Sequence, residues 1–476
     1  MESKNVLVDG ILSRASAAAA EFNQLDQQQT DRIVRAVYEA ALEHRVDLAK
    51  HAHEETGMGR WEDKVIKNTV ASLLVYQSIC DLKTVGFISH DEERGVSEIA
   101  LPIGPILAII PCTNPTSTVM FKVLIALKTR NPIIISSHHR AMECCRKTVD
   151  ILYRAALSAS APEDCILFFE RASREDTQAL MSDKRLALIL ATGGEGVVRA
   201  AYSSGIPALG VGAGNVPVLI EKSADPSFTA EQIMLSKTFD NGTICASEQA
   251  LVVEKALAQP ILDELQKRGA YILSPAEAEK VVAVAFDKEK RTMTADVVGQ
   301  SALKIASMAG IKVPETTRLL LAPTRGVGYD NPLSCEILCP LLAFYTVDNF
   351  DDGVSLCIDL NFHGGIGHTS VIYSNDEEKI KTFALTMNAG RILVNTPSSQ
   401  GAVGGIYNRL MPSFTLGCGT GGKNITMDNI TATHLLNIQR LARRRNNDRL
   451  VRFDPAKFFD TSLSANAIEQ EFNKNR

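Results

Sequence analysis

Short apolar, β-branched runs alternate with helical stretches along this chain, and this alternation limits the fold more than any other feature. Between residues 106 and 192, four runs have the composition of buried parallel strands: ILAIIP, PIIISS, CILFF and LALILAT. Stretches with helical character separate them, for example residues 117–128 and 140–156. This alternation is typical of a doubly wound α/β sheet.

A second block of the same kind follows, with a boundary expected between residues 221 and 226. Its strands are predicted at VPVLIE, ALVVEK, LLLAP, LLAFYTV, HTSVIYS and RILVNT, and its long helices at 226–240 and 275–286. The first hundred residues read mainly as helices, because apolar residues such as Ile33, Val34 and Val37 recur at helical spacing. The sequence therefore predicts an α/β protein with two doubly wound domains.

The composition excludes several classes of protein. The 476 residues are 45% hydrophobic and carry a net charge of -5, so nothing favours binding to nucleic acid. We expect neither a membrane span nor a targeting leader, because the chain has no long apolar run and no basic-then-apolar start. The ten cysteines lack the paired spacing of a structural zinc site, and free thiols fit a reducing cytoplasm.

Three polar or glycine-rich loops lie beside predicted strands. TGGEG at 192–196 joins a strand to a helix, where backbone N–H groups can approach an anion such as pyrophosphate. SSHHR at 136–140 follows another strand, and its hydroxyls, His138 and Arg140 are candidates for a ribose or a phosphate. GVGAGN at 210–215 precedes VPVLIE. Each loop is also compatible with a purely structural turn. In SSHHR, Ser137 would then serve as a helix N-cap.

Three loop side chains are candidates for chemistry on a carbonyl group. Cys245 lies in KTFDNGTICASEQ between an Asn-Gly loop and small residues, a setting in which a thiol can be exposed and reactive. Asn114 follows an apolar strand and is able to donate to an oxyanion. His368 follows the glycines of GGIGHTS, in a loop that can direct an imidazole into a cleft. A buried, inert thiol is the alternative for Cys245, and Cys112 and Cys418 have comparable loop contexts.

The order of these motifs resembles that of the CoA-acylating branch of the aldehyde dehydrogenase superfamily, especially the N-terminal half of bifunctional aldehyde-alcohol dehydrogenases. The matching segments, between residues 57 and 422, are GMGRWEDKVIKN, PIGPILAIIPCTNPTST, LKTRNPIIISSHHRA, ILATGGEGVVRAAYSSGIPALGVGAGN, SKTFDNGTICASEQ, GGIGHTS, RILVNTPSSQG and TLGCGTGG. The resemblance implies a cofactor-binding domain at 1–221, a catalytic domain at 222–423 and a C-terminal segment at 424–476. That segment and a β-hairpin near 92–102 are expected to support a homodimer or homotetramer.

The resemblance also implies roles for individual residues. Cys245 matches the family nucleophile and Asn114 the amide that binds the oxyanion. His368 matches the histidine of the acylating branch, which we expect to position or deprotonate the thiol of CoA. The residues expected along the NAD or NADP cofactor are Ser136, His138, Thr192, Gly193, Gly194 and Glu336. No metal is expected.

One departure from the hydrolytic aldehyde dehydrogenases is informative. Val211 stands at about the place of the glutamate with which those enzymes activate water. Without that base, water should release the acyl group slowly, so the thiol of CoA is expected to release it instead. The implied reversible reaction converts an aldehyde, CoA and NAD(P)+ to acyl-CoA and NAD(P)H.

The sequence leaves the aldehyde open. Acetaldehyde is the default, while similar enzymes act on succinate semialdehyde and sulfoacetaldehyde, whose tails are anionic. The segment at 323–340 departs from the acetaldehyde-type pattern. NTPSSQ at 395–400 offers hydroxyl and amide groups that suit either an anionic tail or a turn.

Two other functions remain open at this point. An acyl-phosphate reductase of the same superfamily would also use a cysteine and a nicotinamide, although the GHT and GVGAGN segments argue against it. A non-catalytic assembly protein is the second, and the intact Cys245 and Asn114 argue against it. The iron-dependent alcohol dehydrogenase domain of the fused relatives is not expected here.

Overall fold

The computed structural model describes residues 6–170, 173–287, 289 and 292–474. The chain divides into two compact units. The larger comprises the described residues up to Leu82 together with Pro102–Leu436, and the smaller comprises Lys83–Leu101 with the described residues from Asn437 onward. Every helix in these ranges is too short or too polar to cross a membrane.

The first sheet of the larger unit has five parallel strands in the order β5-β4-β3-β6-β7. The strands are β3 (Ile106–Ile110), β4 (Ile133–Ser137), β5 (Ile166–Phe168), β6 (Leu188–Thr192) and β7 (Ala208–Val211). The helices between them are α6 (Pro115–Lys128), α7 (Met142–Ser158), α8 (Arg174–Met181) and α9 (Glu195–Tyr202). The strand order reverses between β3 and β6, and sheets of this type bind ligands where the loops after two such strands diverge.

Side-chain alternation along each strand builds two layers of core, one on each face of this sheet. In β3, Ile106, Ala108 and Ile110 pack on one face with residues of α2, α6 and α7. Leu107 and Ile109 point to the other face and pack with residues of α1, α8 and α9. Successive strand residues point to opposite faces, so a strand that is apolar throughout must be covered on both.

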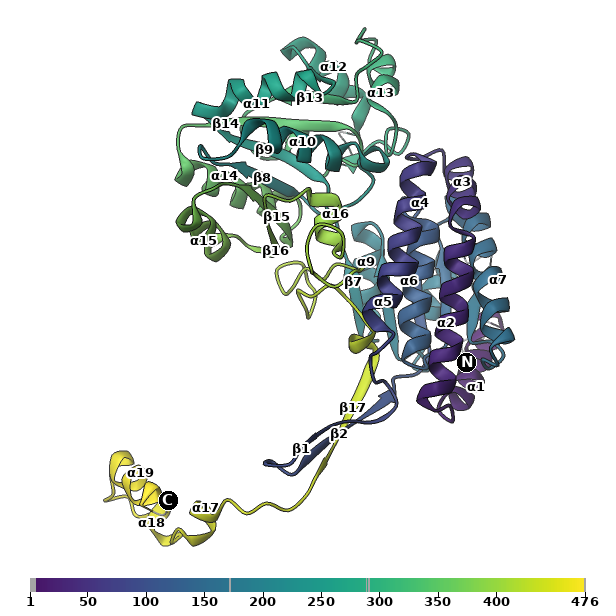
Figure 1. Ribbon diagram of the computed structural model, residues 1–476, viewed down its shortest axis with the longest axis vertical. Coiled ribbons are helices and arrows are strands. Elements are labelled where there is room, and N and C mark those ends of the chain that lie inside the picture. The colour runs from purple at the N-terminus through teal and green to yellow at the C-terminus, as the bar shows by residue number, and fades with distance from the viewer. Residues whose placement is uncertain (1–5, 171–172, 288, 290–291, 475–476) are drawn as a thin grey trace. The chain divides into compact units, whose positions relative to one another are not determined.

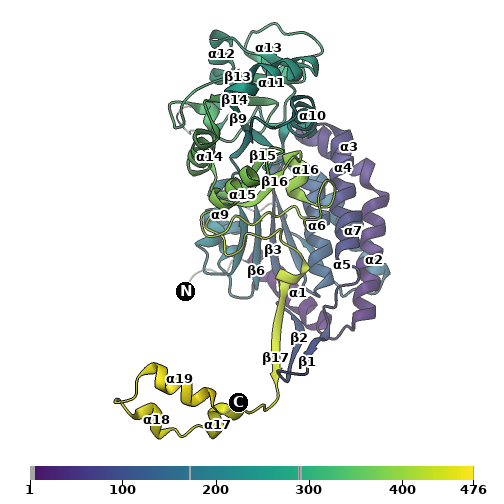
Figure 2. The same ribbon diagram turned by 60° about the vertical axis from the view of Figure 1, so that its left-hand side comes forward.

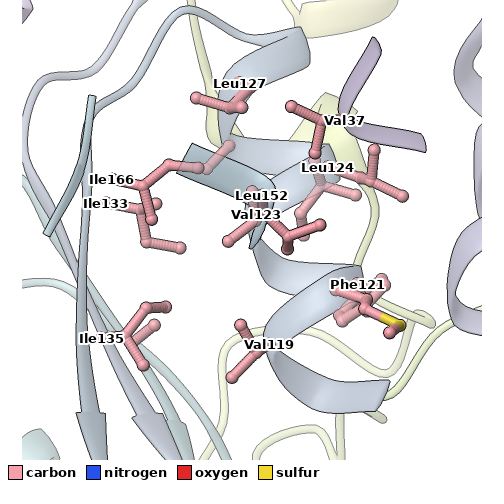
Figure 3. Close-up of a cluster of buried hydrophobic side chains, with 14 of the residues drawn as sticks. Val37, Val119, Phe121, Val123, Leu124, Leu127, Ile133, Ile135, Leu152 and Ile166 are labelled. Atoms are coloured by element: carbon pink, nitrogen blue, oxygen red, sulfur yellow. The ribbon is translucent and has the colours of Figure 1, made fainter. Parts of the chain in front are cut away.

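Helix α6 lies at the centre of the first of these layers. It begins at Pro115, whose fixed φ suits the first helical position, directly after the N-cap residue Asn114. Every residue of α6 is buried, as expected for a helix that neighbours surround. Figure 3 shows Val119 and Val123 of α6 on the side that faces Ile135 and Ile133 of β4.

The helical character predicted for the N-terminal region is confirmed as far as Ile79. The helices are α1 (Val6–Phe22), α2 (Gln27–Glu43), α3 (Arg45–Thr56), α4 (Trp61–Thr69) and α5 (Val75–Ile79), with a π-helical turn at Val70–Leu74. A capping box between Asp26 and Gln29 starts α2. Helices α2 and α7 contact each other beside α6 (Figure 1).

The second sheet of the larger unit has seven parallel strands in the order β10-β13-β14-β9-β8-β15-β16. The strands are β8 (Val216–Ile220), β9 (Glu248–Glu254), β10 (Ala270–Ile272), β13 (Leu319–Pro323), β14 (Leu341–Val347), β15 (Gly367–Tyr373) and β16 (Ala389–Val394). The helices around it are α10 (Pro226–Lys237), α11 (Lys255–Lys267), α12 (Pro275–Ala285), α13 (Ala302–Met308), α14 (Phe350–Gly364), α15 (Glu377–Thr386) and α16 (Ser398–Val403). A short antiparallel pair, β11 (Phe286–Asp287) and β12 (Thr292–Met293), follows α12.

The chain passes from one sheet to the other between β7 and β8. Strand β8 therefore belongs to the second sheet, although it precedes the expected boundary at residue 221. The two predicted doubly wound blocks are thus both present, with the passage a few residues earlier than the sequence pattern indicated.

The smaller unit is built around a three-stranded sheet in the order β1-β2-β17. Its strands are β1 (Gly86–Asp91), β2 (Val96–Pro102) and β17 (Leu436–Ala442), which lie side by side in Figures 1 and 2. The extended segment expected near 92–102 is the second strand of this hairpin, which begins at Gly86. Three short helices follow β17: α17 (Asp448–Arg452), α18 (Ala456–Phe459) and α19 (Ala465–Asn473). A role of this unit in oligomerisation stays a prediction.

Candidate active site

Cys245 lies in a tight loop between α10 and β9. Asp240 and Asn241 turn the chain there with left-handed φ angles of 48° and 52°, which Asp and Asn adopt more readily than other non-glycine residues. The side chain of Asp240 accepts a 2.7 Å hydrogen bond from the backbone N–H of Arg60, the N-cap residue of α4. The loop itself is buried, while Cys245 keeps partial exposure. The nucleophile candidate therefore sits on a fixed turn and is itself a partly exposed residue.

The structure brings His368 directly to this thiol. The imidazole Nε2 lies 3.3 Å from the Sγ atom of Cys245. His368 is the second residue of strand β15, where the run HTSVIYS predicted a strand, and it is fully buried rather than exposed on a loop. Its Nδ1 contacts the hydroxyl of Thr369 at 3.0 Å, and its carbonyl oxygen accepts a 2.7 Å hydrogen bond from the Arg391 guanidinium. These contacts fix both the ring and its backbone.

Burial keeps both partners of this pair uncharged in the free protein. It raises the pKa of Cys245 to about 12, and the nearby Glu336 acts in the same direction. It lowers the pKa of His368 to about 3, and the Arg391 charge adds to that shift. The pair is therefore a neutral thiol beside a neutral imidazole at physiological pH. Reaction then requires a bound group that favours the thiolate.

Gly214 connects this pair to Glu336. Its backbone N–H donates a 3.0 Å hydrogen bond to Glu336 Oε1. A Cβ atom at this position would lie 2.5 Å from the carbonyl oxygen of Cys245 and 3.0 Å from Cγ of His368, so only glycine fits. Burial raises the pKa of Glu336 to about 7, opposed by the Gly214 N–H and by Lys237. The loop GVGAGN thus packs against the site, although Val211 at its start is a buried residue at the end of β7.

Asn114 faces the site from the first sheet, in the loop after β3. It is the N-cap residue of α6, yet its side chain does not cap that helix. Instead its Oδ1 atom accepts a 2.5 Å hydrogen bond from the ammonium of Lys67 in α4. The same ammonium contacts the carboxylate of Asp240 and donates a 2.9 Å hydrogen bond to Thr243. Asn114 is therefore tied through Lys67 to the loop that carries the nucleophile.

The remaining predicted residues gather at the carboxyl edge of the first sheet. Ser136 is buried within β4, while the Oγ of Ser137, at the end of that strand, has no hydrogen-bond partner among the described residues. Thr192 ends β6, and its buried hydroxyl is likewise without a described partner. Gly194 is the N-cap of α9 and provides no side-chain cap.

Two orphaned hydroxyls and an uncapped helix start are what a polar cofactor that spans this edge would satisfy, so the residues present fit a dinucleotide. His138 lies next to this edge, and burial lowers its pKa, with the neighbouring His139 acting in the same direction. The alternative that Ser137 caps the following helix is wrong, because His138 is the N-cap of the 3-10 turn at His139–Ala141 and accepts from Arg140 N–H. In the described part of the chain, no group of three potential ligands gathers to hold a metal ion.

The sequence patterns missed a second cysteine–histidine contact and the lysine behind Asn114. Cys335 Sγ lies 3.4 Å from Nε2 of His363, beside a cavity of about 400 Å³ that Tyr329 also lines. Lys67 lies within the matching segment GMGRWEDKVIKN, and the resemblance assigned it no role. Helix α4 buries Lys64, Lys67 and Asn68 and leaves Ile66 exposed, which inverts the usual apolar face. The local signal in the sequence is the spacing of Lys64 and Lys67, which are three positions apart and therefore lie on the same face of the helix.

Comparison with known proteins agrees with this geometry. Residues 2–407 match the model of the aldehyde dehydrogenase family. An aldehyde-alcohol dehydrogenase of Clostridium acetobutylicum is 46% identical over 92% of this chain and 51% of its own length. A succinate-semialdehyde dehydrogenase (acetylating) of Clostridium kluyveri is 34% identical over 92% of this chain and 96% of its own.

Among solved structures, an acetylating aldehyde dehydrogenase from Geobacillus thermoglucosidasius superposes with a TM-score of 0.90 and 45% identity, covering 92% of this chain and 97% of that one. The chain spans about half the length of the aldehyde-alcohol dehydrogenases that it matches. Family match, relatives and fold agree over the same residues. The chain therefore belongs to the aldehyde dehydrogenase family and is homologous to its acylating members.

Proposed function

We propose that this protein is a CoA-acylating, nicotinamide-dependent aldehyde dehydrogenase. The observation that carries the proposal is the 3.3 Å contact between the thiol of Cys245, a partly exposed residue, and the buried imidazole of His368. Cys245 precedes β9 and His368 lies within β15, and these two strands flank β8 in the second sheet. A cysteine on a rigid turn beside an oriented histidine is the arrangement that covalent catalysis on an aldehyde requires.

In this proposal Cys245, as its thiolate, attacks the aldehyde carbon. The oxygen of the resulting adduct becomes negative and needs donors at hydrogen-bond distance. The Nδ2–H of Asn114 and the backbone N–H of Cys245 are the donors that we assign. Removal of one such donor typically lowers kcat by about 10²–10³-fold. His368 is neutral, so it orients the sulfur through its Nε2 atom and carries no charge.

The residues that would hold NAD or NADP are those at the carboxyl edge of the first sheet, together with Glu336. Ser137 and Thr192 offer unpaired hydroxyls to the cofactor, and the start of α9 offers backbone N–H groups to its pyrophosphate. Glu336, whose carboxylate accepts from the Gly214 N–H, would hold the hydroxyls of the nicotinamide ribose. When bound, the nicotinamide takes up the hydride that turns the adduct into a thioester.

We further propose that CoA, and not water, releases the acyl group. Val211 is 2% exposed and aliphatic, so it provides no base at the place where hydrolytic relatives are expected to carry one. A propionaldehyde dehydrogenase of Rhodopseudomonas palustris, 28% identical, has been solved with bound CoA and an acylated cysteine. The sulfur of CoA then attacks the thioester carbon, the bond to the Cys245 sulfur breaks, and the proton of the CoA thiol passes to Cys245, which returns to its neutral thiol form.

A short, uncharged aldehyde is the substrate class that we favour. The groups of NTPSSQ, which were candidates for binding an anionic tail, are largely engaged within the protein. The Asn395 amide donates to the carbonyl of Ser374, the Thr396 hydroxyl donates to that of Val394, and Ser399 is paired with Ser236. They act as turn and core contacts. The buried hydroxyl of Ser398 has no partner among the described residues, but the segment contains no cationic side chain to bind a carboxylate or sulfonate.

The test is nicotinamide reduction by the purified protein with acetaldehyde, succinate semialdehyde or sulfoacetaldehyde, with NAD or NADP, and with or without CoA. We expect reduction that requires CoA, is fastest with acetaldehyde, and disappears in Cys245→Ser. Cys335→Ser is the matched control, because Cys335 also lies beside a histidine and should leave the rate unchanged. Sustained turnover without CoA would refute the acylating assignment, and preference for an acyl phosphate would favour a reductase of the same family.

A further inference from the structure

The inward-facing side of α4 carries positive charge that the proposed reaction has not used. Lys64 and Lys67 are both 2% exposed, and both ammonium groups contact the same oxygen of Asp240. Asp63 accepts a 2.8 Å hydrogen bond from the backbone N–H of Asp240. Buried charges are destabilising unless they are paired, so a cluster of this kind is retained only where its partners lie close by.

The Lys67 ammonium fixes which end of the Asn114 amide faces the reacting group. Its 2.5 Å contact is with the Oδ1 atom, so the carbonyl end of the amide is occupied. The Nδ2 group, which donates at 3.1 Å to the Thr113 hydroxyl, has two hydrogens and keeps one for another acceptor. An N-cap asparagine usually turns its oxygen to the N–H groups of the helix backbone, which stabilises the helix. Here that oxygen is turned to Lys67 instead.

The same ammonium also contacts the loop that carries the second proposed donor. Lys67 donates a 2.9 Å hydrogen bond to the hydroxyl of Thr243, two residues before Cys245. That hydroxyl donates in turn to Asp240 at 2.8 Å. Asp240 has a left-handed φ of 48°. Its side-chain contacts with Lys67 and Thr243 hold the turn in this conformation. One ammonium thus holds both the amide of Asn114 and the turn that leads to the Cys245 N–H.

We propose that Lys67 is a positioning residue for the oxyanion hole: its ammonium directs Nδ2–H of Asn114 toward the reacting oxygen and strengthens it as a donor. Charge-assisted hydrogen bonds to the oxygen of an amide polarise its N–H groups. Burial lowers the pKa of Lys67 to about 8, opposed by Asp240, so the ammonium is still charged at neutral pH. This inference rests on the proposed function, because it presumes that an oxyanion forms beside Cys245.

The test compares Lys67→Met with Lys64→Met in two assays on the full chain. Lys64 contacts the same carboxylate and the carbonyl oxygen of Thr113, but not the Asn114 side chain. We expect Lys67→Met to lower kcat/KM for aldehyde oxidation by about 10–10²-fold, and Lys64→Met to cause a loss about tenfold smaller. The second assay is the rate of Cys245 alkylation by iodoacetamide, which forms no oxyanion and should stay within about threefold of wild type in Lys67→Met.

A double variant separates positioning from an independent effect. If Lys67 acts through the amide, Lys67→Met in an Asn114→Ala background should cause almost no further loss. Lys67→Gln retains a neutral donor and should recover part of the rate. It also serves as the second variant if Lys67→Met fails to fold.

Parallel losses of alkylation and turnover, or losses that multiply in the double variant, would overturn the proposal. The proposed function would fail in a different way, since wild type would then lack CoA-dependent turnover or Asn114→Ala would retain it in full.

Discussion

Replacement of Gly214 by alanine should test the geometry of the site most directly. The added Cβ atom would lie 2.5 Å from the carbonyl oxygen of Cys245, whereas ordinary contact begins at 3.4 Å. The Cys245 backbone must therefore move by about 0.9 Å, and the ring of His368, at 3.0 Å, must move as well. A misplacement of about 1 Å in an active site lowers the rate by about 10²-fold.

The same loop provides a matched control. Gly212 is two residues earlier, and a Cβ atom built there meets nothing within 4 Å. Neither glycine has a positive φ, so alanine adds no backbone strain at either position. Gly212→Ala should keep the activity and melting temperature of wild type. Gly214→Ala should lose about 10²-fold in kcat/KM and about 1–3 kcal/mol in free energy of unfolding, as overpacking does.

The assay for both variants is CoA-dependent nicotinamide reduction, followed by thermal unfolding of the same preparations. The free energy of unfolding shows how much of the loss in rate comes from a poorly folded fraction. Nearly unchanged turnover in Gly214→Ala would refute the reasoning, because the contact between this loop and the nucleophile would then not limit the reaction. Equal losses in Gly212→Ala would assign the effect to the loop as a whole.

Three further predictions concern charge, backbone and core. Burial raises the pKa of Glu336 to about 7 from its usual 4.5. The wild-type protein therefore loses stability as the pH rises from 4.5 to about 7, because the buried carboxyl group must ionise in the folded state. Glu336→Gln should therefore become more stable than wild type by about 1–3 kcal/mol at pH 8, with no gain at pH 4, in denaturant unfolding. Gly59→Ala should destabilise far more than Gly57→Ala, since both have a positive φ but only Gly59 would clash with a buried carboxylate, at 1.8 Å. Leu124→Ala, in a fully buried position, should cost about 2–5 kcal/mol, while Leu385→Ala, at 89% exposure, should change the melting temperature little.

The sequence by itself determined the two α/β sheets and the candidate nucleophile. Runs such as Ile106–Ile110 and Val216–Ile220 are apolar throughout, and such runs between helical stretches have few alternatives to buried parallel strands. The loop context of Cys245 did not distinguish it from Cys112 or Cys418, and it was assigned through the order of motifs along residues 57–422. Apolar runs and the order of motifs are both read along the chain, so they survive without knowledge of the fold.

The tertiary structure decided which distant residues meet. Cys245 and His368 are 123 positions apart, and they touch because the amino ends of β9 and β15 are brought together by β8 between them. The run HTSVIYS predicted the strand that carries His368, but nothing local indicated that its imidazole is fully buried against a cysteine of another segment. Lys67 shows the same limit: a lysine on a helix reads as solvent-exposed unless its buried partner is known. Its partner Asp240 is 173 positions away, and the pairing of charges across such distances is a property of the folded chain.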